Sequence, residues 1–436
     1  MDSTTSEIND LIDQIKKAFR ADDAARVRAL LDDRPELKAR INEALGPFDS
    51  PAIVNARSRP MLDVLIDAGA DLNAKSRWWA GGFGLLHQCS PELAAYAIER
   101  GAVVDVHAAA RLGMIDRLRE LIAQDPTLVH ARGGDGQTPL HFASTVEVAE
   151  FLLDHGAEID ALDVDHESTP AQYTVDHRQQ VTRFLITRGC KTDILMAAAL
   201  GDLKLVRTHL DADPECIRMR VSEEYFPMVR PKSGGTIYQW TLGFHVSAHQ
   251  VARKFGHEDV FQFLFDHSPE AIKLIVGCWL GDEALVHTLR TQYPNIADSL
   301  TDDDRRQVAR AARNNETTAV RLLLESGLPP DPGIQHQATP LHWAAFHGNV
   351  TMAKLLLARN PPLEAEDADF HSTPLGWAIH GSENGWHCRT GDYAATAEAL
   401  IVAGAKVPEK IEGTEAVREV LRRHRPNESN SQHSPA

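Results

Sequence analysis

The tetrapeptide Thr-Pro-Leu-His occurs twice in the chain, at residues 138–141 and 339–342, and an apolar helical pattern follows each copy. Thr is able to cap the N-terminus of a helix, and Pro is tolerated at the first helical position. A Gly that takes a positive φ is expected to end the second helix of the same unit. A unit that recurs in this way predicts an array of stacked modules in place of one globular core.

Weaker copies of the unit fill the chain between and around these two. Thr169-Pro170 follows the first Thr-Pro pair by 31 residues, and Thr373-Pro374 follows the second by 34. Other copies keep only the Gly-containing join between two helices, at 111–114, 197–206 and 279–282. In a divergent group Pro is expected to stop the helix, at Arg34-Pro35, Asp125-Pro126 and Asp213-Pro214. Together the copies predict about twelve units.

The residues that follow the two full copies point to a known family. Phe142-Ala143 follows the first copy and Trp343-Ala344-Ala345 the second, and each leads toward a Leu-rich second helix. These residues resemble the ankyrin repeat, a turn and two helices with a period of about 33 residues. The resemblance covers roughly residues 7–410 and is strongest at 134–157 and 337–358. It implies an all-α fold, namely an ankyrin-repeat solenoid of stacked helix-turn-helix units with long loop insertions.

The same pattern predicts how the chain is divided. We expect an N-terminal helical cap or divergent repeat, a first block of repeats, an aromatic and Gly-rich insertion, a second block with a C-terminal cap, and a short helix with a disordered tail from Pro426. These segments are 1–48, 49–220, 221–246, 247–410 and 411–436.

Charge and composition narrow the classes of partner. The formal net charge is −17, which argues against binding nucleic acid or an anionic membrane through bulk electrostatics. The nearest approach to a local basic patch is Arg305, Arg306, Arg310 and Arg313, and a solvated helix face explains this run at least as well. Aromatic residues make up 6% of the chain, so a cluster of Trp and Tyr is informative about location.

The remaining features favour a cytoplasmic protein. No secretory signal is evident at the N-terminus, and no apolar stretch approaches the length of a membrane span. The five cysteines are scattered and are expected to be reduced. The chain is similar to bacterial ankyrin-repeat proteins of this length, and that resemblance implies a cytosolic binding protein.

Three departures from the repeat are candidates for function, because insertions in repeat proteins map to loops that are often on the binding face. The segment 76–84 contains Trp78 and Trp79, which form either a plug between repeats or a platform for a ligand ring. The segment 221–246 contains Tyr238 and Trp240; it is either a lid over the groove or a cover for an edge between two halves. We interpret the segment 381–392 as a capping device in preference to a chemical site.

Charged residues gather just before the Thr-Pro pairs, where turn tips are expected to project. They are Asp135, Asp163, Asp165, His166, Glu167, His336, Asp369 and His371. Asp165, His166 and Glu167 are the candidates for acid-base chemistry, since neighbouring carboxylates take different roles when their pKa values separate. A carboxylate-imidazole set is also able to bind a metal. Asp135 and Asp163 are interpreted as turn residues that bind local backbone donors.

The His of Thr-Pro-Leu-His is interpreted as structural. In the ankyrin repeat it resembles a residue that hydrogen-bonds between adjacent turns, which applies to His141, His342 and the aligned His87. The following position is aromatic in four units, and such a stripe indicates packing between repeats. Trp343 and Trp377 are the expected exceptions because they are large and lie near the third insertion in the sequence. The four are Phe142, Tyr173, Trp343 and Trp377.

Two functions are compatible with these features. The first is a binding module that contacts a protein partner through its concave groove and turn tips. Its candidate contact residues are Trp78, Trp79, Asp135, Tyr173, Tyr238, Trp240, His336, Trp343, His371 and Trp377.

The alternative is an enzyme or a receptor for a small polar ligand. Its first candidate reaction is hydrolysis of a sugar-like ring compound by Asp165, His166 and Glu167. It requires these residues and the insertion aromatics to surround one cavity. No phosphate-binding loop, His-Glu-x-x-His or Gly-x-Ser-x-Gly element is present, and we predict neither a cofactor nor a metal site.

Overall fold

The structure is a computed structural model that describes residues 11, 14–44 and 46–425. Over these residues the chain is helical, with isolated β-bridges and no strand. The predicted all-α class is therefore confirmed. The tail that we expected to be disordered lies outside the described residues. None of the described helices has the length and apolar character needed to cross a membrane.

The chain divides into two compact units, 1–261 and 262–436, so the boundary falls inside the predicted second block of repeats. The α-helices that begin in the first unit are α2 (Ala24–Asp33), α3 (Pro35–Ala39), α4 (Arg59–Asp67), α5 (Pro91–Glu99), α6 (Val106–Leu112), α7 (Ile115–Gln124), α8 (Pro139–Phe142), α9 (Val146–Asp154), α10 (Pro170–Thr174), α11 (Gln179–Thr187), α12 (Ile194–Leu200), α13 (Leu203–Ala212), α14 (Tyr238–Thr241), α15 (Ala248–Lys254) and α16 (Glu258–Asp266). Those of the second unit are α17 (Glu270–Leu280), α18 (Glu283–Gln292), α19 (Asp302–Arg305), α20 (Gln307–Arg313), α21 (Thr317–Glu325), α22 (Pro340–Phe346), α23 (Val350–Leu357), α24 (Pro374–Asn384), α25 (Tyr393–Val402) and α26 (Glu415–His424).

The helix ends follow the local signals in the sequence. Each of the four Thr-Pro pairs places Thr at the N-cap and Pro at the first helical position, in α8, α10, α22 and α24. Gly113, Gly201 and Gly281 end α6, α12 and α17 in the left-handed conformation, which costs Gly little because it has no Cβ. The helices α7 and α13 end just before Asp-Pro, as predicted.

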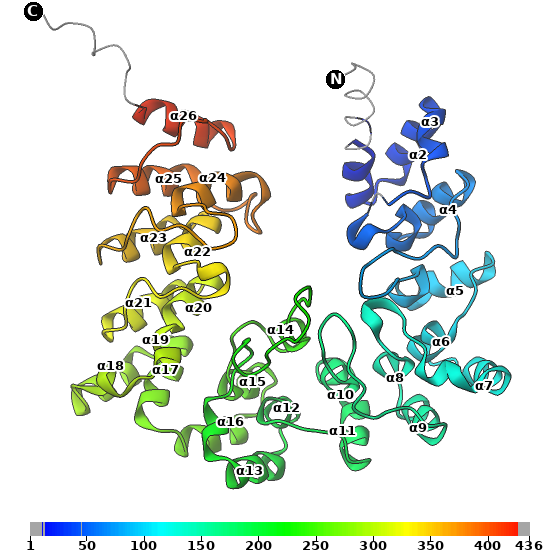
Figure 1. Cartoon of the computed structure of the whole chain (residues 1–436), viewed down its shortest axis with the longest axis horizontal. Coiled ribbons are helices and arrows are strands. Elements are labelled where there is room, and N and C mark those ends of the chain that lie inside the picture. The colour runs from blue at the N-terminus through cyan, green and yellow to red at the C-terminus, as the bar shows by residue number, and fades with distance from the viewer. Residues whose placement is uncertain (1–10, 12–13, 45, 426–436) are drawn as a thin grey trace, which may run out of the picture. The chain divides into compact units, whose positions relative to one another are not determined.

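Within each of the two compact units, the helices of successive repeats pack side by side (Figure 1). In the first unit α6 contacts α8 and α8 contacts α10, while in the second α20 contacts α22 and α22 contacts α24. The second helices form a parallel row, in which α21 contacts α23 and α23 contacts α25. The facing residues are apolar, for example Ala108, Leu140 and Ala344, each with 0% exposure. Burial between neighbouring pairs is therefore the main source of stability.

The two Thr-Pro-Leu-His histidines connect one turn to the next. Nδ1 of His141 accepts from the backbone N–H of Thr138 at 3.1 Å, so Nε2 carries the proton and donates to Ser168 O at 3.1 Å. His342 makes the same pair of bonds, with Thr339 N–H and with Ser372 O. Their contacts are those expected of structural histidines.

Candidate functional site

The second unit contains an aromatic pocket of about 440 Å³. We use this name for the cavity between the tips and first helices of successive repeats. It is lined by Arg313, Gln335, His336, Trp343, Phe346, Phe370, Ser372, Trp377, His380 and Trp386. It brings together three of the predicted contact residues, His336, Trp343 and Trp377. Its volume lies within the range of small-ligand and side-chain pockets, about 300–1,000 Å³.

Arg313 lies against two of the indoles in this pocket. Its guanidinium carbon is 5.4 Å from the ring centre of Trp343 and 5.3 Å from that of Trp386. Its Nε–H donates to Gln335 Oε1 at 3.1 Å. Arg310 and Arg313 are only 4% and 5% exposed, so the interpretation of this basic run as a solvated helix face is wrong for both. A buried guanidinium beside aromatic faces gives the pocket a positive character.

The third insertion forms a wall of the aromatic pocket. The Trp386 indole stacks on Trp343 with ring centres 6.2 Å apart and an interplanar angle of 25°. Gly391 lies so close to α22 that a Cβ there would be 2.4 Å from His347 O. The insertion therefore packs back onto the preceding repeat, and α26 is the helix that packs on α25 at the end of the described chain. The capping interpretation of 381–392 is wrong for this reason.

The first unit contains a group of acidic and imidazole side chains, which we call the open cluster: Asp135, Asp165 and His166. Asp135 belongs to the turn before α8, while Asp165 and His166 belong to the turn before α10. The two turns dock through backbone bonds from Val164 N and Asp165 N to Asp135 O, at 2.8 and 3.1 Å. Nε2 of His166 lies 3.8 Å from an oxygen of each Asp. Two of the three predicted catalytic residues are thus brought beside Asp135.

The 221–246 insertion covers this cluster. Its base is closed by bonds from Val221 N to Val246 O and from His245 N to Val221 O, both 3.0 Å. Near its tip, Gly234 N donates to Asp165 O at 3.0 Å and to Asp165 Oδ1 at 3.1 Å. His166 Nδ1 is 2.7 Å from Gly235 O. The insertion is thus a cover over the turn of the preceding repeat.

Glu167 is directed toward the insertion and not toward Asp165 and His166. Its carboxylate accepts from the backbone N–H groups of Val229 and Arg230, at 2.9 and 2.8 Å. Burial alone would raise the pKa of Glu167, but these donors and the Arg230 cation outweigh it and the pKa is lowered. Its environment is that of a carboxylate that anchors a loop.

The pKa of Asp135 distinguishes it from the other carboxyl groups of the turns. Burial, together with the charges of Asp165 and Asp163, raises its pKa to about 7, against the opposing effects of His166 and Trp78. Burial also raises the pKa of Asp163, which accepts from Ser168 N, His166 N and the Tyr173 hydroxyl. Asp163 therefore has the structural role predicted for it, whereas Asp135 Oδ1 is buried without a hydrogen-bond partner among the described residues.

The other predicted contact residues do not converge on one cavity. Tyr238 is 0% exposed and its hydroxyl donates to Asp193 Oδ2 at 2.8 Å, so it anchors α14 in the core. Trp78 packs edge-on against Phe48, with ring centres 5.0 Å apart, and is also close enough to Asp135 to lower the pKa of that carboxyl. Trp79, Trp240 and His371 are exposed. The condition that we set for the enzyme alternative, one cavity surrounded by all of these residues, is therefore not met.

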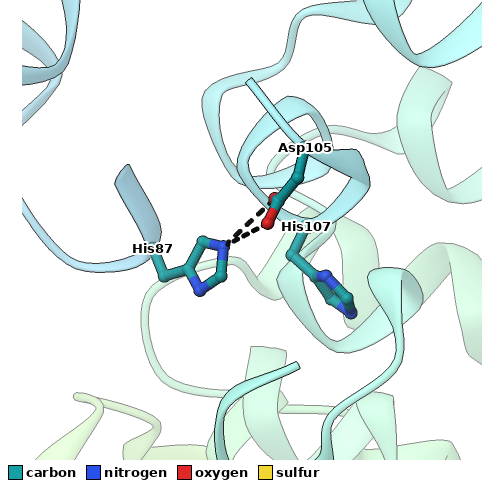
Figure 2. A group of neighbouring side chains, drawn as sticks. All are labelled: His87, Asp105 and His107. Carbon is teal, nitrogen blue, oxygen red and sulfur yellow. Dashed lines mark hydrogen bonds and ion pairs between the residues drawn. The ribbon is translucent and has the colours of Figure 1, made fainter. Parts of the chain in front are cut away.

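A second group of acidic and imidazole side chains, the closed cluster, consists of His87, Asp105 and His107 (Figure 2). His87 Nδ1 accepts from Gly84 N–H, and its Nε2 donates to both oxygens of Asp105 at 3.1 and 3.0 Å. Asp105 also accepts from Lys75 Nζ at 2.8 Å and caps α6 through Ala108 N. Burial alone would raise the pKa of Asp105, but the His87 and Lys75 donors hold it well below its usual range.

Sequence reasoning missed Arg313, Phe370 and Trp386 as pocket residues. Trp386 carried a usable signal, a lone Trp in a Gly-containing insertion. Arg313 carried none, because its partner Gln335 belongs to the next turn tip and its two indoles come from other repeats.

Comparison with known proteins gives the same repeat. The family model described as Ankyrin repeats (3 copies) matches residues 106–196 and 308–388. The serine/threonine-protein kinase VIK of Arabidopsis thaliana is 37% identical over 75 residues, 16% of this chain and 17% of that protein. The Ankyrin repeat and SAM domain-containing protein 6 of Mus musculus is 25% identical over 122 residues, 27% of this chain and 14% of that protein. The matches thus span less than a fifth of each relative. A solved structure, the human ASB11 ankyrin repeat domain, aligns with 69% of this chain and 98% of its own at 20% identity and a TM-score of 0.23.

Proposed function

Because the chain is an ankyrin-repeat protein, we propose that it is a binding protein whose aromatic pocket takes an apolar side chain from a protein partner. The observation that carries this proposal is the pocket itself, in which tips and first helices of successive repeats meet. These are the surfaces through which the sequence predicts contact.

The composition of the pocket suits a protein partner. Interface hot spots are enriched in Trp and Arg, and here three Trp side chains and a buried Arg line the same pocket. Phe370 and Trp386 are 66% and 59% exposed at its edge, so they have apolar area that a partner would cover. Nε1 of Trp343 is buried without an acceptor among the described residues, and an oxygen of the partner would satisfy it.

The proposal is tested with peptides selected from a random display library on the full chain. Selected peptides are expected to contain a large apolar residue and to bind at least about tenfold more weakly to Trp386→Ala, since a hot-spot truncation costs more than 1 kcal/mol. Trp240→Ala is the matched control, because Trp240 is a similarly exposed indole outside the pocket. Peptides that bind Trp386→Ala as tightly as the unchanged chain would exclude the pocket as the binding surface.

We also propose that the protein works in the cytoplasm. The support is its thiols: all five cysteines are free, and Cys388 is exposed, which suits a reducing compartment. Fractionation of cells that express the tagged chain tests this proposal, and recovery outside the cytoplasmic fraction would contradict it.

A further inference from the structure

The open cluster brings three ligand-type atoms together. The candidate ligand atoms of Asp135, Asp165 and His166 all lie within 4.8 Å of one another. His166 Nε2 is 3.8 Å from both Asp135 Oδ2 and Asp165 Oδ2. Two ligands that bind one metal ion at about 2.1 Å lie about 3–4 Å apart. The two His166 separations are therefore too long for hydrogen bonds and lie within the range for two ligands of one metal ion.

The imidazole of His166 is oriented with a lone pair toward the carboxylates. Nδ1 of His166 is 2.7 Å from Gly235 O, and a carbonyl oxygen only accepts, so Nδ1 carries the proton. With a proton on Nδ1 alone, Nε2 is an acceptor that faces two other acceptors. A metal-bound His usually donates its second ring nitrogen to a backbone carbonyl or a carboxylate in this manner.

Burial makes this arrangement costly without a cation. His166 is 8% exposed and Asp165 5% exposed, and Asp135 Oδ1 is buried without a hydrogen bond among the described residues. No Lys or Arg among the described residues pairs with either carboxylate, whereas the closed cluster has Lys75. Buried charges are normally paired or coordinate a metal.

We propose that Asp135, Asp165 and His166 bind one divalent first-row transition-metal ion, with Zn²⁺ as the probe. Two carboxylate oxygens and one imidazole nitrogen suit such ions better than Ca²⁺, which takes six to eight oxygen ligands. This site lies in the first unit and is independent of the aromatic pocket.

The ion would join three segments of the chain. Asp135 comes from one turn, Asp165 and His166 from the next, and Gly234 and Gly235 of the insertion lie against the latter two residues. A Cβ at Gly234 would be 3.3 Å from His166 Cε1 and 3.5 Å from both Asp165 carboxylate oxygens. Zinc binding is thus expected to hold the insertion against the repeats.

The test is equilibrium binding of Zn²⁺ to the full chain after chelator treatment and dialysis. We expect one tightly bound ion per chain and slower amide exchange at Gly234 and Gly235 in its presence. Asp135→Asn and His166→Gln are each expected to weaken binding by at least about 100-fold, because even outer-shell changes cost 10–100-fold. An excess of Ca²⁺ is expected to leave the Zn²⁺ in place.

The control is His177→Ala, which removes an exposed imidazole paired with Asp176 and is expected to leave binding unchanged. Asp135→Asn keeps the size of the side chain, and Asn tolerates the left-handed conformation of this residue, φ 53°. Its circular dichroism is therefore expected to match that of the unchanged chain. The proposal is overturned by the absence of a tight ion, by equally tight binding to both ligand variants, or by loss of the ion from His177→Ala.

Discussion

The open cluster and the closed cluster use the same residue types at neighbouring turns of the first unit, but their polar atoms are partnered differently. In the closed cluster Asp105 accepts from His87, Lys75 and Ala108 N. In the open cluster His166 Nε2 and Asp135 Oδ1 have no hydrogen bond among the described residues. The comparison teaches that Asp and His near each other do not by themselves indicate a ligand site. The deciding feature is whether the chain itself supplies the partners.

The largest effect is expected from Asp105→Ala in the closed cluster. The change removes the cap of α6 and leaves the Nε2–H of His87 buried without its acceptor. The free energy of unfolding is expected to fall by about 3 kcal/mol. Urea titration followed by circular dichroism measures this, and an unchanged midpoint would show that the closed cluster is not structural. Zinc binding is expected to be unaffected.

The opposite result is expected for Asp135→Asn in the open cluster with chelator present. Burial is the largest cause that raises the pKa of Asp135, from 3.8 to about 7. The contribution of the protonated carboxyl to stability is therefore fully present below about pH 4 and is lost as the pH rises through 7. At pH 8 the Asn variant is expected to be more stable than the unchanged chain by about 2 kcal/mol, and at pH 5 nearly equal to it. A variant less stable at pH 8 would contradict this.

A smaller effect is expected in the closed cluster, where acid destabilises the fold through His107. Burial lowers the pKa of His107 from 6.5 to about 4, so its contribution to stability is complete above pH 6.5 and is lost as the pH falls toward 4. Between pH 7 and pH 5.5 it is expected to cost about 1 kcal/mol. His107→Gln is expected to reduce this dependence, as measured by urea titration at both pH values. If the two proteins lost the same stability between pH 7 and pH 5.5, this would contradict the interpretation of His107 as a buried neutral imidazole.

The smallest effect is expected from Glu167→Gln, beside the open cluster. The change weakens the charge-assisted bonds to Val229 N and Arg230 N, so exchange of these amides is expected to quicken while global stability falls by less than 1 kcal/mol. Hydrogen exchange with mass spectrometry measures both amides. Unchanged exchange would show that Glu167 does not anchor the insertion.

The repeat fold could be predicted from the sequence because its signals are local. Thr before Pro begins α8 and α22, and Gly113 ends α6, within a few residues of the signal in each case. The predicted count of about twelve units stays a prediction, because weak copies carry only part of the signal.

The candidate sites could be predicted only in part. Asp165 and His166 were found because charge is dense in their turn. Which atoms remain unpaired depends on Gly235, 69 residues away from His166 in the chain. The pocket residues Trp343 and Trp377 were found from their size, while Arg313 lies against Trp343 and Trp386 through packing that spans several repeats. Contacts of this range leave no local pattern.

The closed base of the 221–246 insertion has a consequence for the evolution of the sequence in this loop. Arg220 and Ser247 form a bridge across that base, so the path between the flanking repeats is short whatever the loop contains. Replacing the loop in a single genetic event would preserve the register of α12 and α15, provided that the new loop fills the volume of Tyr238. The cover is therefore a segment whose length is able to change while α12 and α15 stay in contact.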